Sequence, residues 1–189
     1  MVSNMEEVRQ FVSKFCDGSP MLIAIDGEDG AGKTTIISPL IAEALSGKIV
    51  SVDDFLGKDK KGYADFIGYQ ALKEKIDDYL KLGPVIVEGI MLLKIFLKIK
   101  LKPDKFLYVS SEVWFSEWEE YRLSGKKIDE IISDTESRIT KSEKYLDPEK
   151  KDEYRLTSFR KEMYVYTFEY KPMERAGEVL VLHSGDWLK

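Results

Sequence analysis

The chain has 189 residues, of which 43% are hydrophobic and 33% are charged, proportions typical of a soluble domain with a buried core. Its formal net charge of -5 argues against a nucleic-acid partner, which needs a basic surface, but permits a small anionic ligand held by local positive charge. A single cysteine excludes an intrachain disulfide, and no stretch resembles a membrane span or a secretory signal, so we expect a cytoplasmic protein with no membrane partner.

The first half of the chain alternates helical patterns with short apolar runs. Apolar residues at helical spacing in 8–15 predict a helix, and the apolar run 21–25 is typical of a buried strand. A helix is expected over 34–45, ended by Gly47, and a strand over 49–52. A glycine-rich loop over 57–68 and a helix over 69–82 come next, and Gly83 and Pro84 separate that helix from a strand over 84–87.

The second half adds two predicted strands, over residues 106–109 and 179–182. Between them, residues 112–172 are highly charged and mostly helical in pattern, whereas residues 92–106 mix alternation with helical spacing and allow no assignment. Strands alternating with helices predict an α/β protein with a parallel sheet of about five strands, covered on both faces, in one domain over residues 1–189.

A glycine-rich segment joins the first predicted strand to the following helix. It reads Gly27, Glu28, Asp29, Gly30, Ala31, Gly32, Lys33, Thr34 and Thr35. Its first eight residues fit G-x-x-x-x-G-K-[ST], which chance produces in under about one chain in a hundred of this length.

The spacing in this segment has a physical reason. Glycines let consecutive backbone N–H groups point into one concavity, and the following helix adds its positive end, so the segment suits phosphate oxygens. Lys33 is expected to reach the β- and γ-phosphates, and the Thr34 hydroxyl to bind Mg²⁺. The segment therefore predicts a site for a nucleoside triphosphate with magnesium.

Carboxylates stand where the first three predicted strands end. Asp26 follows the first strand, Asp53 and Asp54 follow the second, and Glu88 follows the third. Because ligands gather at the carboxyl ends of parallel strands, we expect these acids to meet beside the γ-phosphate. One of them would accept the proton of an attacking hydroxyl, and another would hold magnesium.

The runs IAIDGEDGAGKTT, VSVDDF and VIVEGI resemble the uridine kinase family and its relatives: pantothenate kinase, phosphoribulokinase and nicotinamide riboside kinase. The run YKPMERAGEVLVL resembles the lysine-proline segment that leads into the family's last strand. The resemblance implies the three-layer P-loop NTPase fold with a helical lid, and transfer of the γ-phosphate of ATP to a hydroxyl of a small molecule, most simply a nucleoside. It also implies that Asp53 is the base and that Glu88 lies near magnesium and the acceptor, beside Lys33 and Thr34.

The lid is expected around residues 119–153. Where uridine kinases carry an R-G-R element, this chain has Ser124, Gly125 and Lys126, with Arg122 and Lys127 close by. We expect Arg122 and Lys126 to reach phosphate, although lysine lacks the bidentate fork of arginine. The loop that shapes the nucleoside pocket in the family has no clear counterpart in residues 57–68, so the sequence leaves the acceptor open.

Two other functions stay open. Asp29 stands where the thymidylate kinase loop has an aspartate that serves the acceptor nucleotide, which favours a nucleoside monophosphate kinase, although the aspartate-arginine motif of those enzymes is missing. The chain also suits a regulatory nucleotide-binding protein without an acceptor, but it has no guanine-reading Asn/Thr-Lys-x-Asp element.

Two groups of aromatic residues have distinct interpretations. Tyr63, Phe66 and Tyr69 follow Asp53 and are candidates for stacking on a substrate ring, beside core packing. A second group between residues 164 and 170 favours core packing or the surface of a homodimer.

Overall fold

The computed structural model describes residues 21–57, 63–142 and 156–182. Within them, five strands form one parallel sheet in the order β2-β3-β1-β4-β5. The strands are β1 (Leu22–Gly27), β2 (Lys48–Ser51), β3 (Val85–Glu88), β4 (Lys105–Ser111) and β5 (Glu178–Leu182). The predicted α/β class and the parallel sheet are confirmed, while the helix predicted over 8–15 lies outside the described residues.

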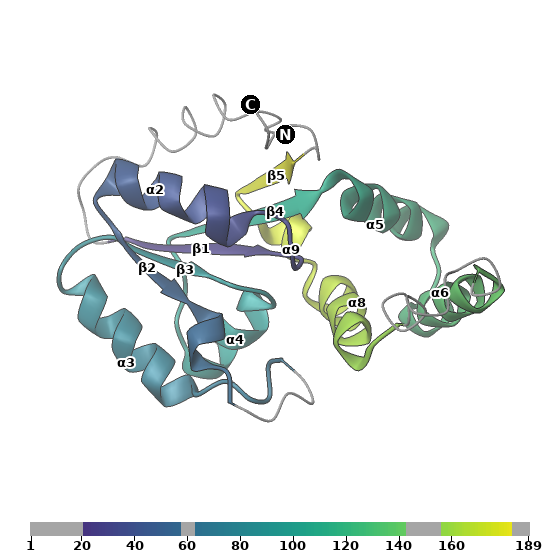
Figure 1. Cartoon of the computed structure of the whole chain (residues 1–189), viewed down its shortest axis with the longest axis horizontal. Coiled ribbons are helices and arrows are strands. Elements are labelled where there is room, and N and C mark those ends of the chain that lie inside the picture. Colours follow the sequence, from purple (N-terminus) through teal and green to yellow (C-terminus); the bar gives the residue numbers. More distant parts are fainter. Residues whose placement is uncertain (1–20, 58–62, 143–155, 183–189) are drawn as a thin grey trace.

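Helices cover both faces of this sheet. The helical segments are η1 (Lys33–Ile37), α2 (Ser38–Leu45), η2 (Val52–Phe55), α3 (Tyr69–Leu80), α4 (Leu92–Ile99), α5 (Glu112–Ser124), α6 (Ile128–Ser142), α8 (Ser158–Tyr170) and α9 (Pro172–Arg175). Figure 1 shows α2 on one face and α3 and α4 on the other, with α5 and α6 extending beyond the sheet. Among the described residues, no helix is long and apolar enough to cross a membrane.

The two faces of the sheet bury two separate apolar clusters. Ile23 and Ile25 of β1 pack with Ile41 of α2, whereas Leu22 and Ala24 belong to the cluster that faces α3 and α4. This division follows from strand geometry, because successive side chains point to opposite faces. The same alternation decides where the acidic side chains at the strand ends point.

The helix after the glycine-rich segment begins with a wide turn. The N–H of Ile37 donates to Gly32 O at 3.3 Å, and the N–H of Ser38 donates to Lys33 O, which are both five-residue spacings. Pro39 has no N–H to continue the pattern, and α2 proper begins at Ser38. The helix predicted over 34–45 is therefore confirmed, with a π-helical first turn.

Residues 92–106, which the sequence left unassigned, contain α4 and the start of β4. Leu92, Ile95, Phe96 and Ile99 are buried on one face of α4, which is helical spacing. The alternating pattern that obscured this spacing continues past the end of the helix, where Lys100 adopts a left-handed conformation at φ 55°.

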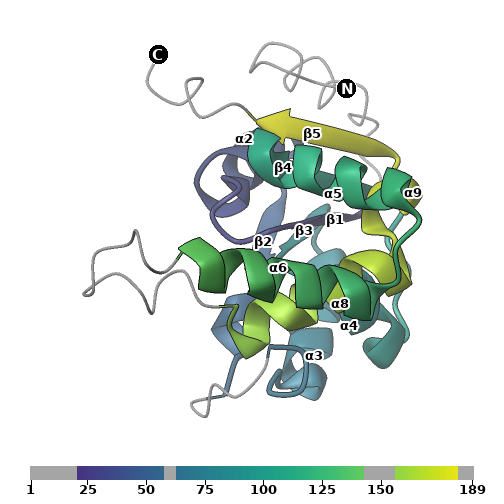
Figure 2. The same cartoon turned by 90° about the vertical axis from the view of Figure 1, so that its right-hand side faces the viewer.

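The described part of the expected lid consists of the end of α5 and all of α6. Figure 2 shows α6 in front of α8, and Tyr121 of α5, Ile131 of α6 and Tyr164 of α8 form one buried cluster. Residues 143–155 of the expected lid lie outside the described residues. Core packing is thereby confirmed for Tyr164, and Tyr166 is also buried.

Candidate functional site

The glycine-rich segment forms a backbone concavity between β1 and η1. Gly30 and Gly32 have φ of 74° and 84°, a left-handed conformation that side chains with a Cβ rarely adopt. A Cβ on Gly27 would lie 2.0 Å from Val109 O, so this position also needs glycine for the close approach of β1 to β4. The Ala31 side chain is buried in the apolar cluster between the sheet and α2, and this packing anchors the segment to the core.

Lys33 is buried at the base of this concavity. Its ammonium group donates to Gly27 O at 3.1 Å and to Glu28 O at 2.7 Å, and only 7% of the residue is exposed. Burial lowers the pKa of Lys33, while the nearby carboxylates of Asp26, Glu28 and Glu88 oppose that shift. The Lys33 ammonium group therefore lies within the glycine-rich segment, where it would contact a phosphate bound by the N–H groups of the same segment.

Thr34 and Glu88 bring two oxygen ligands together. Thr34 is an exposed residue whose hydroxyl donates to Glu88 Oε2 at 2.6 Å, and Glu88 is 1% exposed at the end of β3. No cluster of three or more His, Cys, Asp or Glu that suits a metal occurs in the described part of the chain. A hydroxyl and one carboxylate still fit Mg²⁺, which is usually held by one or two protein oxygens together with substrate phosphates and waters.

A cavity of about 660 Å³ connects this pair to Asp53. The predicted site residues that line it are Asp29, Gly30, Gly32, Lys33, Thr34, Thr35, Asp53 and Glu88. Asp53 belongs to the short helical turn η2 that follows β2, and its Oδ1 accepts a hydrogen bond of 2.6 Å from the Tyr63 hydroxyl. The structure thus gathers the predicted base, lysine and magnesium ligands around one space.

Asp26 does not join them, so the expectation that it meets the other acids is wrong. It is fully buried, and it accepts hydrogen bonds from the N–H groups of Gly27 (2.8 Å) and Leu92 (3.2 Å) and from the Tyr166 hydroxyl. Burial raises its pKa from 3.8 to about 6, although these hydrogen bonds partly oppose the shift. The cause is strand alternation, which turns Asp26 toward α4 and α8. Asp54 is exposed and does not line the cavity as far as the structure describes it.

Glu28 was predicted to bind the cofactor, but its side chain turns away from this cavity. The carboxylate is buried and accepts hydrogen bonds from the N–H of Ser111 and, at 3.5 Å, from Ser110 Oγ, both at the end of β4. Burial raises the pKa of Glu28. Glu28 therefore contributes its backbone to the segment, while its side chain ties the segment to β4.

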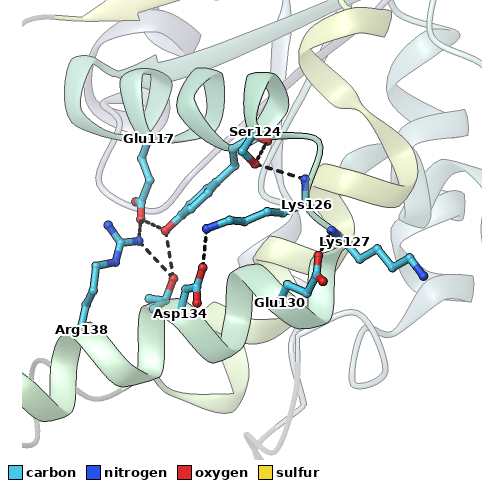
Figure 3. A network of polar contacts seen from close by, with 9 residues as sticks. Glu117, Ser124, Lys126, Lys127, Glu130, Asp134 and Arg138 are labelled. Atoms are coloured by element: carbon cyan, nitrogen blue, oxygen red, sulfur yellow. Dashed lines mark hydrogen bonds and ion pairs between the residues drawn. The ribbon is translucent and has the colours of Figure 1, made fainter.

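The two predicted lid cations pair with carboxylates in the lid itself. The Arg122 guanidinium binds Glu119 through two nitrogens, and Lys126 Nζ lies 2.6 Å from Asp134, as Figure 3 shows for the second pair. Neither residue is among the described residues that line the cavity. Their contact with phosphate stays a prediction, which requires these ion pairs to open.

Two other arginines lie closer to the glycine-rich segment. Arg138 of α6 and Arg160 of α8 line a second cavity of about 750 Å³, which Glu28 and Asp29 also line. Both cavities share Asp29 and Phe159 as walls. The sequence contains these arginines, but no motif distinguishes them from Arg122, because the fold alone brings α6 and α8 to this place.

The wall of the first cavity around Tyr63 is partly aromatic. Tyr63 and Phe66 line it, as the sequence suggested, together with Ile90 and with Ser158 and Phe159 of α8. Tyr69 does not line it in the described structure, and its hydroxyl donates to Ala64 O instead. Sequence reasoning missed Phe159, because it lies more than 100 residues from Asp53 in the charged half of the chain.

No protein-family model and no curated protein sequence matches the chain. Among solved structures, it is similar to a possible uridine kinase from Bacillus stearothermophilus, with a TM-score of 0.55 and 13% identity over 93% of this chain and 98% of the other.

Two further structures match with a TM-score of 0.35, which is too low to support an argument. They are a thymidylate kinase from Candida albicans (16% identity, covering 58% of this chain and 68% of the other) and a LAO/AO transport system kinase (12% identity, covering 94% and 57%). Together with the strand order, the similarity to the possible uridine kinase shows that this chain has the same α/β fold as that structure.

Proposed function

We propose that the protein is an ATP-dependent kinase that transfers the γ-phosphate, in the presence of Mg²⁺, to a hydroxyl group of a small molecule. One observation carries this proposal: Lys33, Thr34 and Asp53 line the same cavity. A triphosphate in the glycine-rich segment would place its last phosphate group beside Lys33. The rest of the cavity then leaves room for an acceptor whose hydroxyl lies between that phosphate and Asp53.

Each of these residues has a distinct role in the proposal. Lys33 and the backbone N–H groups of the segment stabilise negative charge on the phosphates during transfer. Thr34 and Glu88 would hold magnesium, which when bound supplies positive charge that balances the phosphate oxygens. Asp53 accepts the proton of the acceptor hydroxyl as that oxygen attacks phosphorus. Phosphoryl transfer needs little more than this positioning and charge balance.

A nucleoside is the acceptor that the cavity walls suit best. Tyr63, Phe66 and Phe159 supply aromatic surface, and Asp53 supplies an acceptor for a sugar hydroxyl. Aromatic walls with a few convergent polar groups are typical of sites that bind ring-containing ligands. The aliphatic Ile90 adds apolar surface beside them.

A nucleoside monophosphate is the second candidate. Asp29 lines both cavities, and Arg138 and Arg160 line the second one. Guanidinium groups bind phosphate in a bidentate manner, so an acceptor that carries its own phosphate would gain from them. Glu28 and Glu117 line the same cavity, however, and their carboxylates oppose an anionic ligand there.

ADP release from Mg-ATP tests the proposal. The assay compares the rate without an acceptor against rates with uridine, cytidine, nicotinamide riboside, pantothenate, ribulose 5-phosphate and thymidine monophosphate. Strong stimulation by a nucleoside would support the leading proposal, and stimulation by the monophosphate alone would favour the second candidate. Slow hydrolysis that no acceptor changes would favour a regulatory nucleotide-binding protein and would count against the kinase.

A further inference from the structure

The Asp53 carboxylate has a hydrogen-bond partner in the residues that follow η2. Asp53 is exposed, and in the described part of the chain the Tyr63 hydroxyl is the only group with a hydrogen bond to its side chain. That contact is 2.6 Å long and engages Oδ1, which leaves Oδ2 for another partner. A general base must lie within about 2.6–3.2 Å of the group whose proton it takes, so the rotamer of Asp53 matters for transfer.

We propose that Tyr63 is a positioning residue that orients Asp53 toward the acceptor, and that Glu162 and Lys94 hold Tyr63 in place. This inference deepens the proposed function and rests on it. Tyr63 would act through Asp53 rather than on the phosphate. Tyr63 would thus both contact the acceptor as part of the cavity wall and orient Asp53.

The Tyr63 hydroxyl is suited to act as a permanent donor. The residue is 6% exposed, and burial together with the Asp53 carboxylate raises the pKa of Tyr63 far above its ordinary value. The phenol therefore keeps its proton at neutral pH. A neutral donor on Oδ1 fixes the carboxylate without neutralising it, so Oδ2 stays available as a base.

Two helices fix the position of Tyr63. Its backbone N–H donates to Glu162 Oε2 of α8 at 3.1 Å, and the other oxygen of Glu162 lies 3.1 Å from Lys94 Nζ of α4. Both charged side chains are about three-quarters buried, with 26% of Lys94 and 21% of Glu162 exposed. Partial burial reduces solvent screening, so this ion pair restrains Tyr63 more than an exposed pair would.

The ring of Tyr63 is restrained as well. It packs against Phe159, one turn before Glu162 on α8, with ring centroids 6.1 Å apart and planes tilted by 56°. The same helix therefore carries a cavity wall, in Phe159, and an anchor for Tyr63, in Glu162. A change in the position of α8 would therefore move Phe159 in the cavity wall and, through Glu162 and Tyr63, also the predicted base Asp53.

The test compares Tyr63→Phe with Tyr69→Phe, using the acceptor that stimulates ADP release most. Tyr63→Phe removes only the hydroxyl that contacts Asp53, and we expect kcat to fall about tenfold, as for the loss of one hydrogen bond to a charged group. The KM for ATP should not change. Tyr69→Phe removes a hydroxyl that contacts Ala64 O in the same segment, and its kcat should stay within about twofold of the original, because its contact does not reach Asp53.

A double variant separates positioning from a merely structural effect. If Tyr63 acts through Asp53, then Tyr63→Phe causes no further loss in a protein that already carries Asp53→Asn, because the base is gone. Glu162→Gln keeps an oxygen for the Tyr63 N–H and should retain more activity than Glu162→Ala. Thermal unfolding of every variant identifies any that has lost its fold.

Two results would overturn the inference in different ways. Losses that add in the double variant, or a Tyr63→Phe enzyme with unchanged kcat, would refute positioning while leaving the kinase intact. A chain that transfers phosphate to no acceptor would refute the proposed function, and the inference with it.

Discussion

Asp26 and Glu88 lie at the carboxyl ends of neighbouring strands but point to opposite faces of the sheet. Ile25 of β1 pairs with Glu88 of β3, so Asp26, one residue further along, turns to the other side. Glu88 meets Thr34 at the start of η1, whereas Asp26 is enclosed by Leu92 and Tyr166. The Glu88 carboxylate thus reaches the candidate site, whereas the Asp26 carboxylate connects β1 to α4 and α8 through buried hydrogen bonds.

Removal of the Asp26 charge should change how stability depends on pH. The pKa of Asp26 rises from 3.8 in the unfolded chain to about 6 in the folded one, so the folded state binds the proton more tightly. This contribution to stability is present below pH 3.8 and is lost as the pH rises through 6, by about 3 kcal/mol in total. Because the amide of Asp26→Asn does not titrate, the stability of this variant relative to the original chain should rise by about that much between pH 4 and 7.

Urea unfolding at several pH values measures this difference. Tyr166→Phe serves as the matched variant, because the Tyr166 hydroxyl lowers the pKa of Asp26, and its loss should extend the decline in stability to higher pH. Identical pH profiles for Asp26→Asn and the original chain would show that the buried carboxylate does not titrate in this range.

Replacement of Asp53 should separate nucleotide binding from chemistry. Asp53→Asn keeps the size of the side chain but removes the base, so phosphate transfer should fall by about 10²–10⁴ while ATP binding is retained. Asp54→Asn changes the neighbouring, exposed acid outside the described cavity lining and should have little effect. Equal rates for the Asp53 variant and the original enzyme would mean that another group takes the proton.

Lys33→Ala should weaken both ATP binding and transfer. The variant loses the buried ammonium group that lies between Gly27 O and Glu28 O, and we expect a loss of at least about 10² in kcat/KM for ATP. Lys48→Ala, at the exposed start of β2, is the control for loss of a positive charge. Circular dichroism of both variants checks that the overall secondary structure is retained, and unchanged kinetics for Lys33→Ala would show that this residue does not act on the phosphates.

Glu88→Gln should raise the magnesium requirement. The carboxylate that accepts from Thr34 would become a neutral amide, so half-maximal activity should need about tenfold more Mg²⁺. Glu43→Gln, on the exposed side of α2, should leave the titration unchanged. A shift in the KM for the acceptor without a shift in the magnesium titration would assign Glu88 to the acceptor instead.

The sequence locates the strands and the glycine-rich segment well because both are local patterns. Apolar runs bounded by turn residues locate all five strands to within about two residues, and the spacing from Gly27 to Thr34 has one mechanical explanation. The orientation of Asp26 could also have been predicted from the sequence. A strand that buries Ile23 and Ile25 on one face must turn Asp26 to the other face. The error came from placing every acid at a strand end in the site.

The aromatic cavity wall of Tyr63, Phe66 and Phe159 was less predictable because it depends on contacts between distant segments. Phe159 and Glu162 reach Tyr63 only after α8 packs beside α4, and nothing in their local sequence distinguishes them from other residues of a charged helix. Arg138 and Arg160 are similar cases, because their approach to Asp29 follows from the packing of α6 and α8. The positions of α6 and α8 must therefore be known before one can say which arginines of the charged half approach the glycine-rich segment.

The order of strands has a consequence for how such a site changes by mutation during evolution. The glycine-rich segment extends from β1, whose six residues are all buried between two neighbouring strands, while Asp53 follows β2 at the edge of the sheet. Central strands open last in local unfolding, and loops after edge strands accept substitution more readily. Under the proposed function, mutations on the Asp53 side can therefore alter which molecule receives phosphate while the glycine-rich segment stays intact, so new acceptors are accessible through few changes.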